Sequence, residues 1–146
     1  MKIRFATSQD KEQILKLMDE FNVLLKSQDV PSKIGGAMFD EIIKSGDNKI
    51  FVAEENNKLI GTATLYFLPN IRHGEKMGYV KNFYVTERMR DKGVGRAIFG
   101  AIKKYCLENN VKVIKLTSSN KLKNAHNFYE AMGGKSTERS FRFDIE

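Results

Sequence analysis

Hydrophobic and polar positions alternate along this chain with two different periods, and each period predicts one type of element. From Ile14 to Leu25 and from Val94 to Tyr105, apolar side chains recur every three or four residues, which is the spacing of a helix with one buried face. Stretches rich in β-branched and aromatic residues between turn residues predict strands. The predicted strands are Lys2–Ala6, Ile50–Glu55, Lys58–Leu68, Tyr79–Val85, Val111–Thr117 and Phe141–Ile145.

Capping and breaking residues set the limits of the predicted helices. Thr7, with Asp10 three positions later, forms an approximate capping box for the first helix. Pro31 suits the first turn of the second helix, and Gly35-Gly36 indicates that this helix is either two short pieces or a mobile segment. The predicted helices run from after Thr7 to about Lys26, over Pro31–Ile43, from Val94 to about Asn109, and over Asn124–Met132.

The order of the predicted elements is β-α-α-β-β-β-α-β-α-β. Asn56-Asn57 predicts a two-residue hairpin turn, and Pro69–Lys76 predicts a polar loop between two strands. This order favours an α/β (α+β) fold in which helices flank a mixed, mostly antiparallel central sheet. No repeat, linker or low-complexity segment interrupts the pattern, so residues 1–146 are expected to form a single domain.

The composition is that of a globular protein. Apolar residues make up 41% and charged residues 29% of the chain, and no apolar run reaches the roughly 18 residues of a membrane span. The first ten residues lack the apolar stretch of a signal peptide, so a cytoplasmic location is expected. Cys106 is the one cysteine, and we expect it to be a buried structural thiol with neither a disulfide nor a metal site.

The net charge of +7 admits nucleic acid, a membrane surface or an acidic small ligand as a partner. Lys and Arg are scattered, however, and no basic run of five or six residues occurs. The sequence also has neither a recognition-helix motif nor an aromatic–basic strand pattern of the RNA-binding kind. We therefore expect no nucleic acid and no membrane as partner, and we expect a polyanionic small ligand to account for part of the excess charge.

A glycine-bearing loop joins a predicted strand to the long helix and contains the run R-x-x-G-x-G at Arg90–Gly95. The first N–H groups of a helix lack intrahelical partners and carry partial positive charge, and glycine lets an anion approach the backbone closely. The loop therefore predicts a site for a phosphate-rich ligand, although a plain strand–helix turn with solvated basic residues would have the same sequence. The basic residues around the loop are Arg88, Arg90, Lys92 and Arg96.

Two other phosphate-binding motifs do not fit this loop. The P-loop sequence G-x-x-x-x-G-K-[ST] is absent. A dinucleotide-binding loop beginning at Gly93 would need Gly or Ala where Ile98 stands, and it would lie early in a βαβ unit rather than past the middle of the chain.

Two motifs in this order resemble the GNAT superfamily of N-acetyltransferases. Val85, followed by R-x-x-G-x-G and an apolar helix, resembles the loop that binds the pyrophosphate of acetyl-CoA. Leu116–Gly134 (LTSSNKLKNAHNFYEAMGG) resembles the family's strand, asparagine and Ala-His-x-Phe-Tyr-Glu segment. The order of elements from Lys2 to Met132 is also similar. The resemblance implies the GNAT fold, in which the strands at Tyr79–Val85 and Val111–Thr117 splay apart around the pantetheine arm.

The resemblance implies acetyl-CoA as cosubstrate and places residues around it. The backbone of the strand end, at Phe83, Tyr84 and Val85, would pair with the pantetheine amides. Asn120 falls where relatives have a polar contact to the cofactor arm. The pyrophosphate would be held by the backbone amides of Arg90, Asp91, Lys92, Gly93, Val94, Gly95 and Arg96.

Tyr129 matches the tyrosine to which the family often assigns protonation of the departing thiolate. A phenol, whose ordinary pKa is about 10, can donate to a thiolate whose acid has a pKa of about 8.5 if the site adjusts the difference. The alternative is that Tyr129 and Phe128 only pack their helix on the core. His126 is expected to be a structural or surface group rather than a catalyst.

Two positions depart from the family pattern. Many relatives carry Glu directly before the asparagine that matches Asn82, as the base for the acceptor amine, and Lys81 stands there instead. Gly134 stands where relatives usually have Phe, and it either widens the site or caps the helix. The remaining candidates for the base are His73, Glu75 and Glu130.

The expected function is direct transfer of the acetyl group of acetyl-CoA to a primary amine, and the acceptor is expected to be a small molecule. The Ala-His-x-Phe-Tyr segment and Ser140–Phe143 resemble most the branch that acts on small amines such as aminoalkylphosphonates. The alternatives are acetylation of a protein amine, a non-catalytic acyl-CoA-binding module of the same fold and, from another class, a basic nucleic-acid-binding domain. A homodimer is compatible with the resemblance, because dimers are common in the family.

Overall fold

The computed structural model describes residues 1–146 and divides into two units, Met1–Leu116 and Thr117–Glu146. The first unit contains all five strands and most of the helices, and the second contains one helix. No helix is both long enough and apolar enough to cross a membrane. The single-domain organisation stays a prediction.

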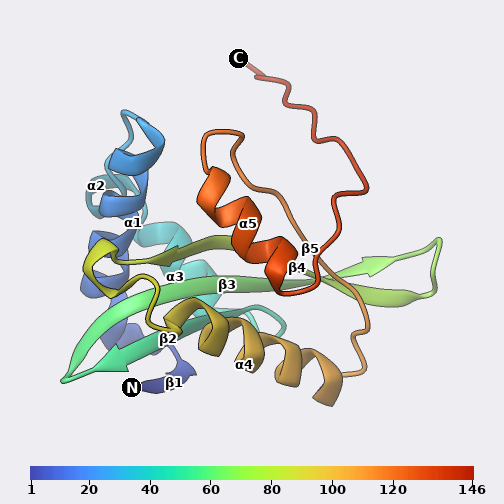
Figure 1. Ribbon diagram of the computed structural model, residues 1–146, viewed down its shortest axis with the longest axis horizontal. Helices are drawn as coiled ribbons and strands as arrows, with labels where there is room; N and C mark the ends of the chain where they lie inside the picture. The colour runs from blue at the N-terminus through green and yellow to red at the C-terminus, as the bar shows by residue number, and fades with distance from the viewer. The chain divides into compact units, whose positions relative to one another are not determined.

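The first unit is built on one five-stranded sheet in the order β1-β2-β3-β4-β5 (Figure 1). Its first three pairings are antiparallel, and β5 runs parallel to β4. The predicted mixed, mostly antiparallel sheet with flanking helices is therefore confirmed. The strands are β1 (Lys2–Phe5), β2 (Lys49–Glu55), β3 (Lys58–Asn70), β4 (Glu75–Val85) and β5 (Ile114–Leu116), and the helices are η1 (Ser8–Asp10), α1 (Lys11–Leu25), α2 (Pro31–Ile34), α3 (Gly36–Lys44), η2 (Glu87–Met89) and α4 (Val94–Glu108).

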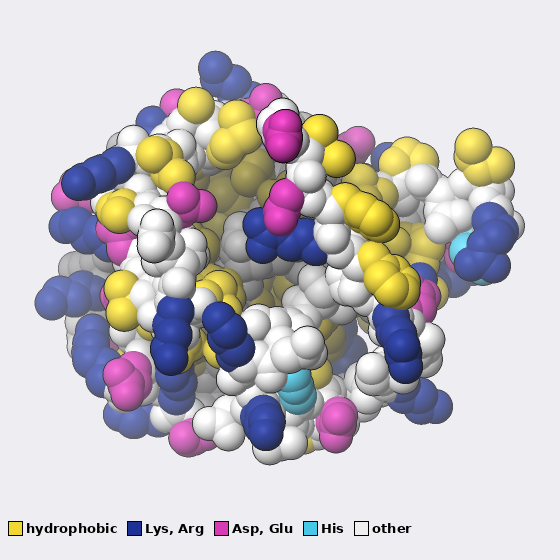
Figure 2. All heavy atoms as spheres, turned by 90° about the horizontal axis from the view of Figure 1, so that it is seen from above, with side chains coloured by type: hydrophobic (Ala, Val, Ile, Leu, Met, Phe, Trp, Pro, Cys, Tyr) yellow, Lys and Arg dark blue, Asp and Glu magenta, His cyan; other side chains and the backbone are white.

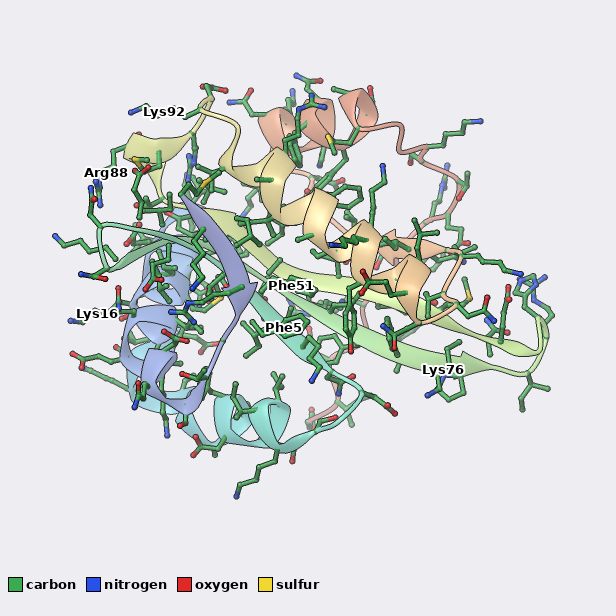
Figure 3. All side chains as sticks on the ribbon, turned by 90° about the horizontal axis from the view of Figure 1, so that it is seen from below. Phe5, Lys16, Phe51, Lys76, Arg88 and Lys92 are labelled. Atoms are coloured by element: carbon green, nitrogen blue, oxygen red, sulfur yellow. The ribbon has the colours of Figure 1, made fainter.

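Helices cover both faces of the sheet, and β2 shows how its sequence divides between them. Phe51 and Ala53 pack in a cluster with α4, whereas Ile50 and Val52 pack in a second cluster with α1 and α3. Successive side chains of a strand point to opposite faces, so a continuous apolar run is what a strand covered on both sides requires. Phe5 of β1 and Phe51 point toward one another, with ring centroids 5.2 Å apart (Figure 3).

Cys106 lies in the cluster between α4 and the sheet and is almost completely buried. Burial raises the pKa of its thiol to about 11, because the thiolate would lose its hydration. The thiol is therefore protonated at neutral pH, and the prediction of a buried structural cysteine is confirmed.

The helical predictions of the N-terminal half are confirmed in detail. Thr7 and Asp10 form a capping box at the start of η1, the 3-10 turn directly before α1, in which Gln9 donates its N–H to the Thr7 hydroxyl and Thr7 donates its N–H to Asp10. The expected break at Gly35-Gly36 separates α2 from α3. The hairpin turn at Asn56-Asn57 is also present, and both asparagines have positive φ, at 51° and 63°, as this turn type requires.

Half of the predicted polar loop Pro69–Lys76 is strand, so that prediction was wrong at both ends of the loop. β3 continues to Asn70 and β4 begins at Glu75, with Pro69 paired to Lys76, so only 71–74 form the turn. Cross-strand pairing overrides the low strand propensity of these polar residues. The strand predicted over Val111–Thr117 is shorter than expected, because only Ile114–Leu116 pair with β4.

A β-bulge in β4 changes which face its end presents. Between the paired positions Thr62–Tyr84 and Thr64–Lys81, β4 has one residue more than β3. The bulge contains Asn82, whose φ is +54°. Val80, before the bulge, packs with α4, whereas Tyr84, after it, packs with α1. In a regular strand these two side chains would share a face, because they are four positions apart. The bulge therefore turns Tyr84 toward α1.

We expect Asn82→Val to lower the free energy of unfolding by about 1–2 kcal/mol, because a β-branched side chain is strained at positive φ. Asn82→Gly tolerates this backbone conformation and is expected to change stability by less than about 0.5 kcal/mol. Urea denaturation followed by circular dichroism measures both variants. Equal stabilities for the Val and Gly variants would contradict the strained conformation at Asn82.

The second unit contains α5 (Lys123–Ala131), which agrees with the predicted helix Asn124–Met132 to within one residue at each end. The strand predicted over Phe141–Ile145 is absent, and Phe141, Phe143 and Ile145 are 77–90% exposed. Alternation of apolar and polar residues predicts a strand only where another strand supplies hydrogen bonds. This prediction was therefore wrong, and the segment has no regular structure.

Candidate functional site

The predicted strand–loop–helix unit is present at the end of β4. β4 ends at Val85, and α4 begins at Val94 with Gly93 before it in the left-handed region, at φ +84°. The first helical hydrogen bond runs from Ala97 N–H to Gly93 O, at 3.0 Å, and no side chain caps the helix. The N–H groups of the first helical turn, residues 94–96, therefore have no acceptor within the helix.

Basic side chains surround this helix start without acidic partners. No ion pair involves Arg88, Lys92 or Arg96, and all three are exposed. In Figure 3, Arg88 and Lys92 project outward from the segment that precedes α4. Elsewhere Lys and Arg occur at many separate places on the visible face, interspersed with Asp and Glu (Figure 2). The loop thus combines unpaired cations with a helix dipole, which together favour an anion.

The ladder between β4 and β5 covers only Gly78–Val80, so it stops before the end of β4. Thr86 donates its N–H to Ile60 of β3 at 2.9 Å, and neighbouring residues of a strand point their backbone groups in opposite directions. The N–H and C=O of Val85 therefore point away from β3. The Val85 carbonyl accepts a hydrogen bond from Arg90 Nε at 3.0 Å.

Tyr84, which we expected only as a backbone contact, has a structural role through its side chain. Its hydroxyl donates to Glu20 of α1 at 3.1 Å, and Thr86 donates to the same carboxylate oxygen at 2.8 Å. Its ring stacks on Phe21, with centroids 5.2 Å apart, and Arg90 lies over it at 5.4 Å. Burial raises the pKa of the phenol, and the Glu20 carboxylate raises it further. These contacts fix α1 against the end of β4.

Sequence reasoning missed Glu20. It lies on α1 between Leu17 and Phe21, both of which pack in the cluster under this helix, so its spacing places it near the buried face. That spacing is the one signal that could have identified Glu20, because a carboxylate near a buried helix face needs hydrogen-bond donors.

In the second unit, α5 and the segment before it hold three of the predicted positions. Asn120 is exposed and lies in the turn before α5. His126 contacts the carbonyl of Ser119 through Nε2 at 2.9 Å, which fixes this turn and agrees with a structural histidine. Tyr129 is half-buried beside the Phe128 ring, and burial raises the pKa of its phenol to about 12.

Gly134 is explained by the end of α5. Its N–H donates to the carbonyl of Tyr129 at 2.9 Å, and Gly133 before it has φ +94°. A Cβ atom on Gly134 would lie 2.8 Å from that same carbonyl oxygen. The helix end therefore requires glycine, which supports capping rather than a widened site as the reason for the departure from the family pattern.

The candidates for a base do not gather at the bulge. His73 lies in the β3–β4 turn and Glu75 begins β4. Glu75 is seven residues from Asn82, which corresponds to about 23 Å along a strand. Lys81 is exposed beside Asn82. The structure therefore separates His73 and Glu75 from the end of β4.

Comparison with known proteins identifies the class to which this fold and loop belong. Among solved structures, a transcriptional regulator from Bacillus halodurans C-125 has a TM-score of 0.87 at 23% identity, covering 99% of both chains. An aminoglycoside acetyltransferase from an uncultured soil metagenomic sample, in complex with sisomicin, has a TM-score of 0.81 at 17% identity, covering 99% of this chain and 95% of the other. Both likenesses show the fold.

The sequence model of the acetyltransferase (GNAT) family matches residues 14–134, and the chain belongs to this family. It is therefore an N-acetyltransferase of the GNAT type. The uncharacterised N-acetyltransferase YhfO of Bacillus subtilis (strain 168) is 25% identical over 135 residues, which cover 91% of this chain and 89% of YhfO. These comparisons support the family, of which acetyl-CoA is the general donor, and not the aminoalkylphosphonate branch.

Proposed function

We propose that this enzyme transfers the acetyl group of acetyl-CoA directly to a primary amine of a small molecule. The observation that carries the proposal is the start of α4, where N–H groups without helical acceptors meet unpaired cations beside the end of β4. A pyrophosphate fits such a place, because it offers several anionic oxygens to backbone donors and to Arg and Lys.

The residues around this place suit the rest of the donor molecule as well. The backbone of Val85 points away from β3, and its carbonyl is held by Arg90, whose side chain would move when a pantetheine amide pairs there. Phe83 lies at the same strand end, whereas the backbone of Tyr84, the neighbour of Val85, points toward β3. For Asn120, which belongs to the second unit, the family resemblance alone supports a polar contact to the cofactor arm. Arg90 would then be released toward the pyrophosphate.

The proposed reaction is one displacement in a ternary complex. The neutral amine attacks the thioester carbonyl, the C–N bond forms, and the C–S bond breaks to release the CoA thiolate. A backbone N–H at the end of β4 would stabilise the oxyanion. The amine loses one proton, and the thiolate gains one.

Tyr129 is the proposed donor to the leaving thiolate. Because burial raises the pKa of its phenol to about 12, the phenol remains protonated at neutral pH and can donate. A thiol has a pKa of about 8.5, so complete proton transfer from this phenol costs about 5 kcal/mol, at 1.36 kcal/mol per pKa unit. We therefore propose that Tyr129 stabilises the thiolate by a hydrogen bond and passes its proton as the charge develops.

We expect Tyr129→Phe to lower kcat by about 100-fold, because the leaving thiolate loses its donor, while acetyl-CoA affinity changes by less than about 2-fold. Release of free thiol gives kcat, and calorimetric titration gives the affinity. Tyr105→Phe removes a hydroxyl from a tyrosine packed in the α4 cluster and is the matched control. Unchanged turnover of Tyr129→Phe across pH would exclude the donor role.

Titration with acetyl-CoA, followed by a thiol-release assay against small amines, tests the function. Binding with release on one class of amines supports it. Binding without release on any small amine favours a protein amine as acceptor or a non-catalytic acyl-CoA-binding module. Absence of binding would contradict the role of Arg90–Arg96. The cytoplasmic location and the homodimer stay predictions.

A further inference from the structure

A small cavity lies between α1, α3 and the sheet, within the first unit. Its volume is about 80 Å³, and apolar side chains form its walls, among them Ile14 and Met18 of α1, Ile42 of α3 and Ile50 of β2. A buried water needs about 15 Å³, and an apolar cavity of about 150 Å³ holds benzene. The cavity therefore has room for a branched group of three or four carbon atoms.

The sheet side of the cavity carries its polar groups. The Thr62 hydroxyl donates to Phe51 O at 2.9 Å and is satisfied. Thr64 is only 6% exposed and also lines the cavity. Asn82, on the bulge, also lines the cavity, and its carboxamide has no partner. Thr64 and Asn82 can both accept hydrogen bonds from an amine.

Lys81 stands next to these two acceptors. It is directly opposite Thr64 in the antiparallel register of β3 and β4, so both side chains leave the same face of the sheet, with Cβ atoms about 5 Å apart. Lys81 is exposed and takes part in no ion pair. An unpaired cation therefore lies beside an apolar cavity that is also lined by Thr64 and Asn82, two side chains with acceptor oxygens.

We propose that the acceptor is a small aliphatic amine that carries an anionic group, as a branched-chain amino acid does. The hydrocarbon branch fills the cavity, Thr64 and Asn82 accept hydrogen bonds from the amine, and Lys81 pairs with the anionic group. This inference rests on the proposed acetyltransferase function and specifies its substrate class. Lys81 also disfavours the protonated form of an amine bound beside it, which is the form that cannot attack.

The same arrangement disfavours polycationic acceptors. An aminoglycoside such as sisomicin would bring several positive charges to Lys81 and offers no branched hydrocarbon for the cavity. Like charges at this distance repel, and the repulsion is strongest where apolar walls exclude water. The structural likeness to aminoglycoside acetyltransferases therefore does not extend to the acceptor.

The test compares L-leucine with L-leucinamide, which differ in the carboxylate. Calorimetric titration of the protein, with CoA present and absent, gives the affinities, and thiol release from acetyl-CoA gives kcat/KM. We expect L-leucine to be preferred at least 10-fold in both measurements. Lys81→Glu is expected to reverse the preference, whereas Lys76→Glu, the same charge reversal elsewhere on β4, leaves it unchanged. The affinity and kcat/KM of the phosphonate analogue of leucine show whether the site prefers a carboxylate or a phosphonate.

Ile42→Phe tests the cavity separately, because the larger side chain fills it. We expect the KM for L-leucine to rise at least 10-fold and the KM for glycine, which has no branch, to stay unchanged. Thr64→Val replaces the hydroxyl by a methyl group of similar size and is expected to raise KM for both amino acids. Acetyl-CoA affinity and circular dichroism show whether each variant is folded.

Equal binding of leucine and leucinamide, no binding of either, or an equal effect of Ile42→Phe on leucine and glycine would overturn the inference. Thiol release on other amines, with no preference for leucine over leucinamide, would overturn this inference but not the proposed acetyltransferase function. The expected binding pattern without thiol release would instead contradict the proposed function, and it would leave the assignment of the anionic aliphatic ligand supported.

Discussion

Gly95→Glu is expected to weaken acetyl-CoA binding at least 100-fold while leaving the protein as stable as before, or more stable. Gly95 is the second residue of α4, so the new carboxylate lies among the N–H groups proposed to hold the pyrophosphate. Two like charges about 4–5 Å apart at an effective dielectric constant of about 20 repel by about 3–4 kcal/mol, which corresponds to more than 100-fold in affinity.

The effect on stability has the opposite sign, and this separates binding from folding. Replacing a helical glycine adds about 0.5–1 kcal/mol of helix stability, and an acidic side chain in the first turn interacts favourably with the helix dipole. A variant that binds acetyl-CoA poorly because it is unfolded would instead have a lower free energy of unfolding than the wild type. Calorimetric titration and urea denaturation at one ionic strength measure the two quantities.

Gly100→Glu is the matched control. It lies on the same helix, is exposed, and a Cβ atom there meets nothing within 4 Å. Both substitutions lower the net charge by one, so any general electrostatic effect on an anionic ligand is shared. We expect Gly100→Glu to change acetyl-CoA affinity by less than about 2-fold. Equal losses in the two variants would mean that the start of α4 is not the pyrophosphate site.

Most of the fold could be predicted because local signals and burial agree. β2 has a continuous apolar run, and the run is buried by helices on both sides. The capping box at Thr7 and the hairpin at Asn56-Asn57 depend on residues within four positions of one another. Such features need no knowledge of distant parts of the chain.

The features that escaped prediction depend on partners far away in the sequence. The bulge at Asn82 is defined only by the count of residues in β3, and it decides which way Tyr84 points. The contact of Glu20 with Tyr84 and Thr86 joins residues more than 60 positions apart. The alternation at Phe141–Ile145 is typical of a strand, yet no strand forms there.

The candidate site was predictable to the same extent. The strand, loop and helix around Arg90–Gly95 follow from local glycine and basic residues, and their geometry is present. The cavity beside Thr64 could not be foreseen, because its walls come from α1, α3 and β2, and its size depends on how these elements pack. Lys81 is visible in the sequence as a departure from the family pattern, but its position opposite Thr64 follows only from the register of β3 and β4.

Asp10→Asn is expected to lower the free energy of unfolding by about 2–4 kcal/mol. Asp10 is 5% exposed and accepts two hydrogen bonds from the Arg4 guanidinium, at 2.8 and 2.9 Å, and one from Thr7 N–H at 2.8 Å. Removing one partner of a buried pair costs about 3–5 kcal/mol, and the loss here is smaller because Arg4 keeps Glu54. Urea denaturation of both proteins measures the difference.

The dependence of this difference on pH identifies its cause. The Arg4 guanidinium, above all through its hydrogen bonds, lowers the pKa of Asp10 below the ordinary value of 3.8, against the opposing effect of burial. A carboxyl whose pKa is lower in the folded state stabilises that state fully above its unfolded pKa, and the contribution is lost as pH falls through the folded pKa. The difference between wild type and Asp10→Asn should therefore be constant from pH 6 to 8 and shrink below about pH 4.

Glu12→Gln is the control for this experiment, because Glu12 is an exposed carboxylate whose one ion pair, with Lys16, lies on the surface of α1. We expect its urea midpoint to stay close to that of the wild type at every pH, since exposed pairs contribute little. A loss in Asp10→Asn that persists unchanged to pH 3 would assign the effect to packing rather than to charge. A loss that disappears in acid would show that the ion pair joins β1 to the start of α1, the helix that carries Glu20 and one wall of the cavity.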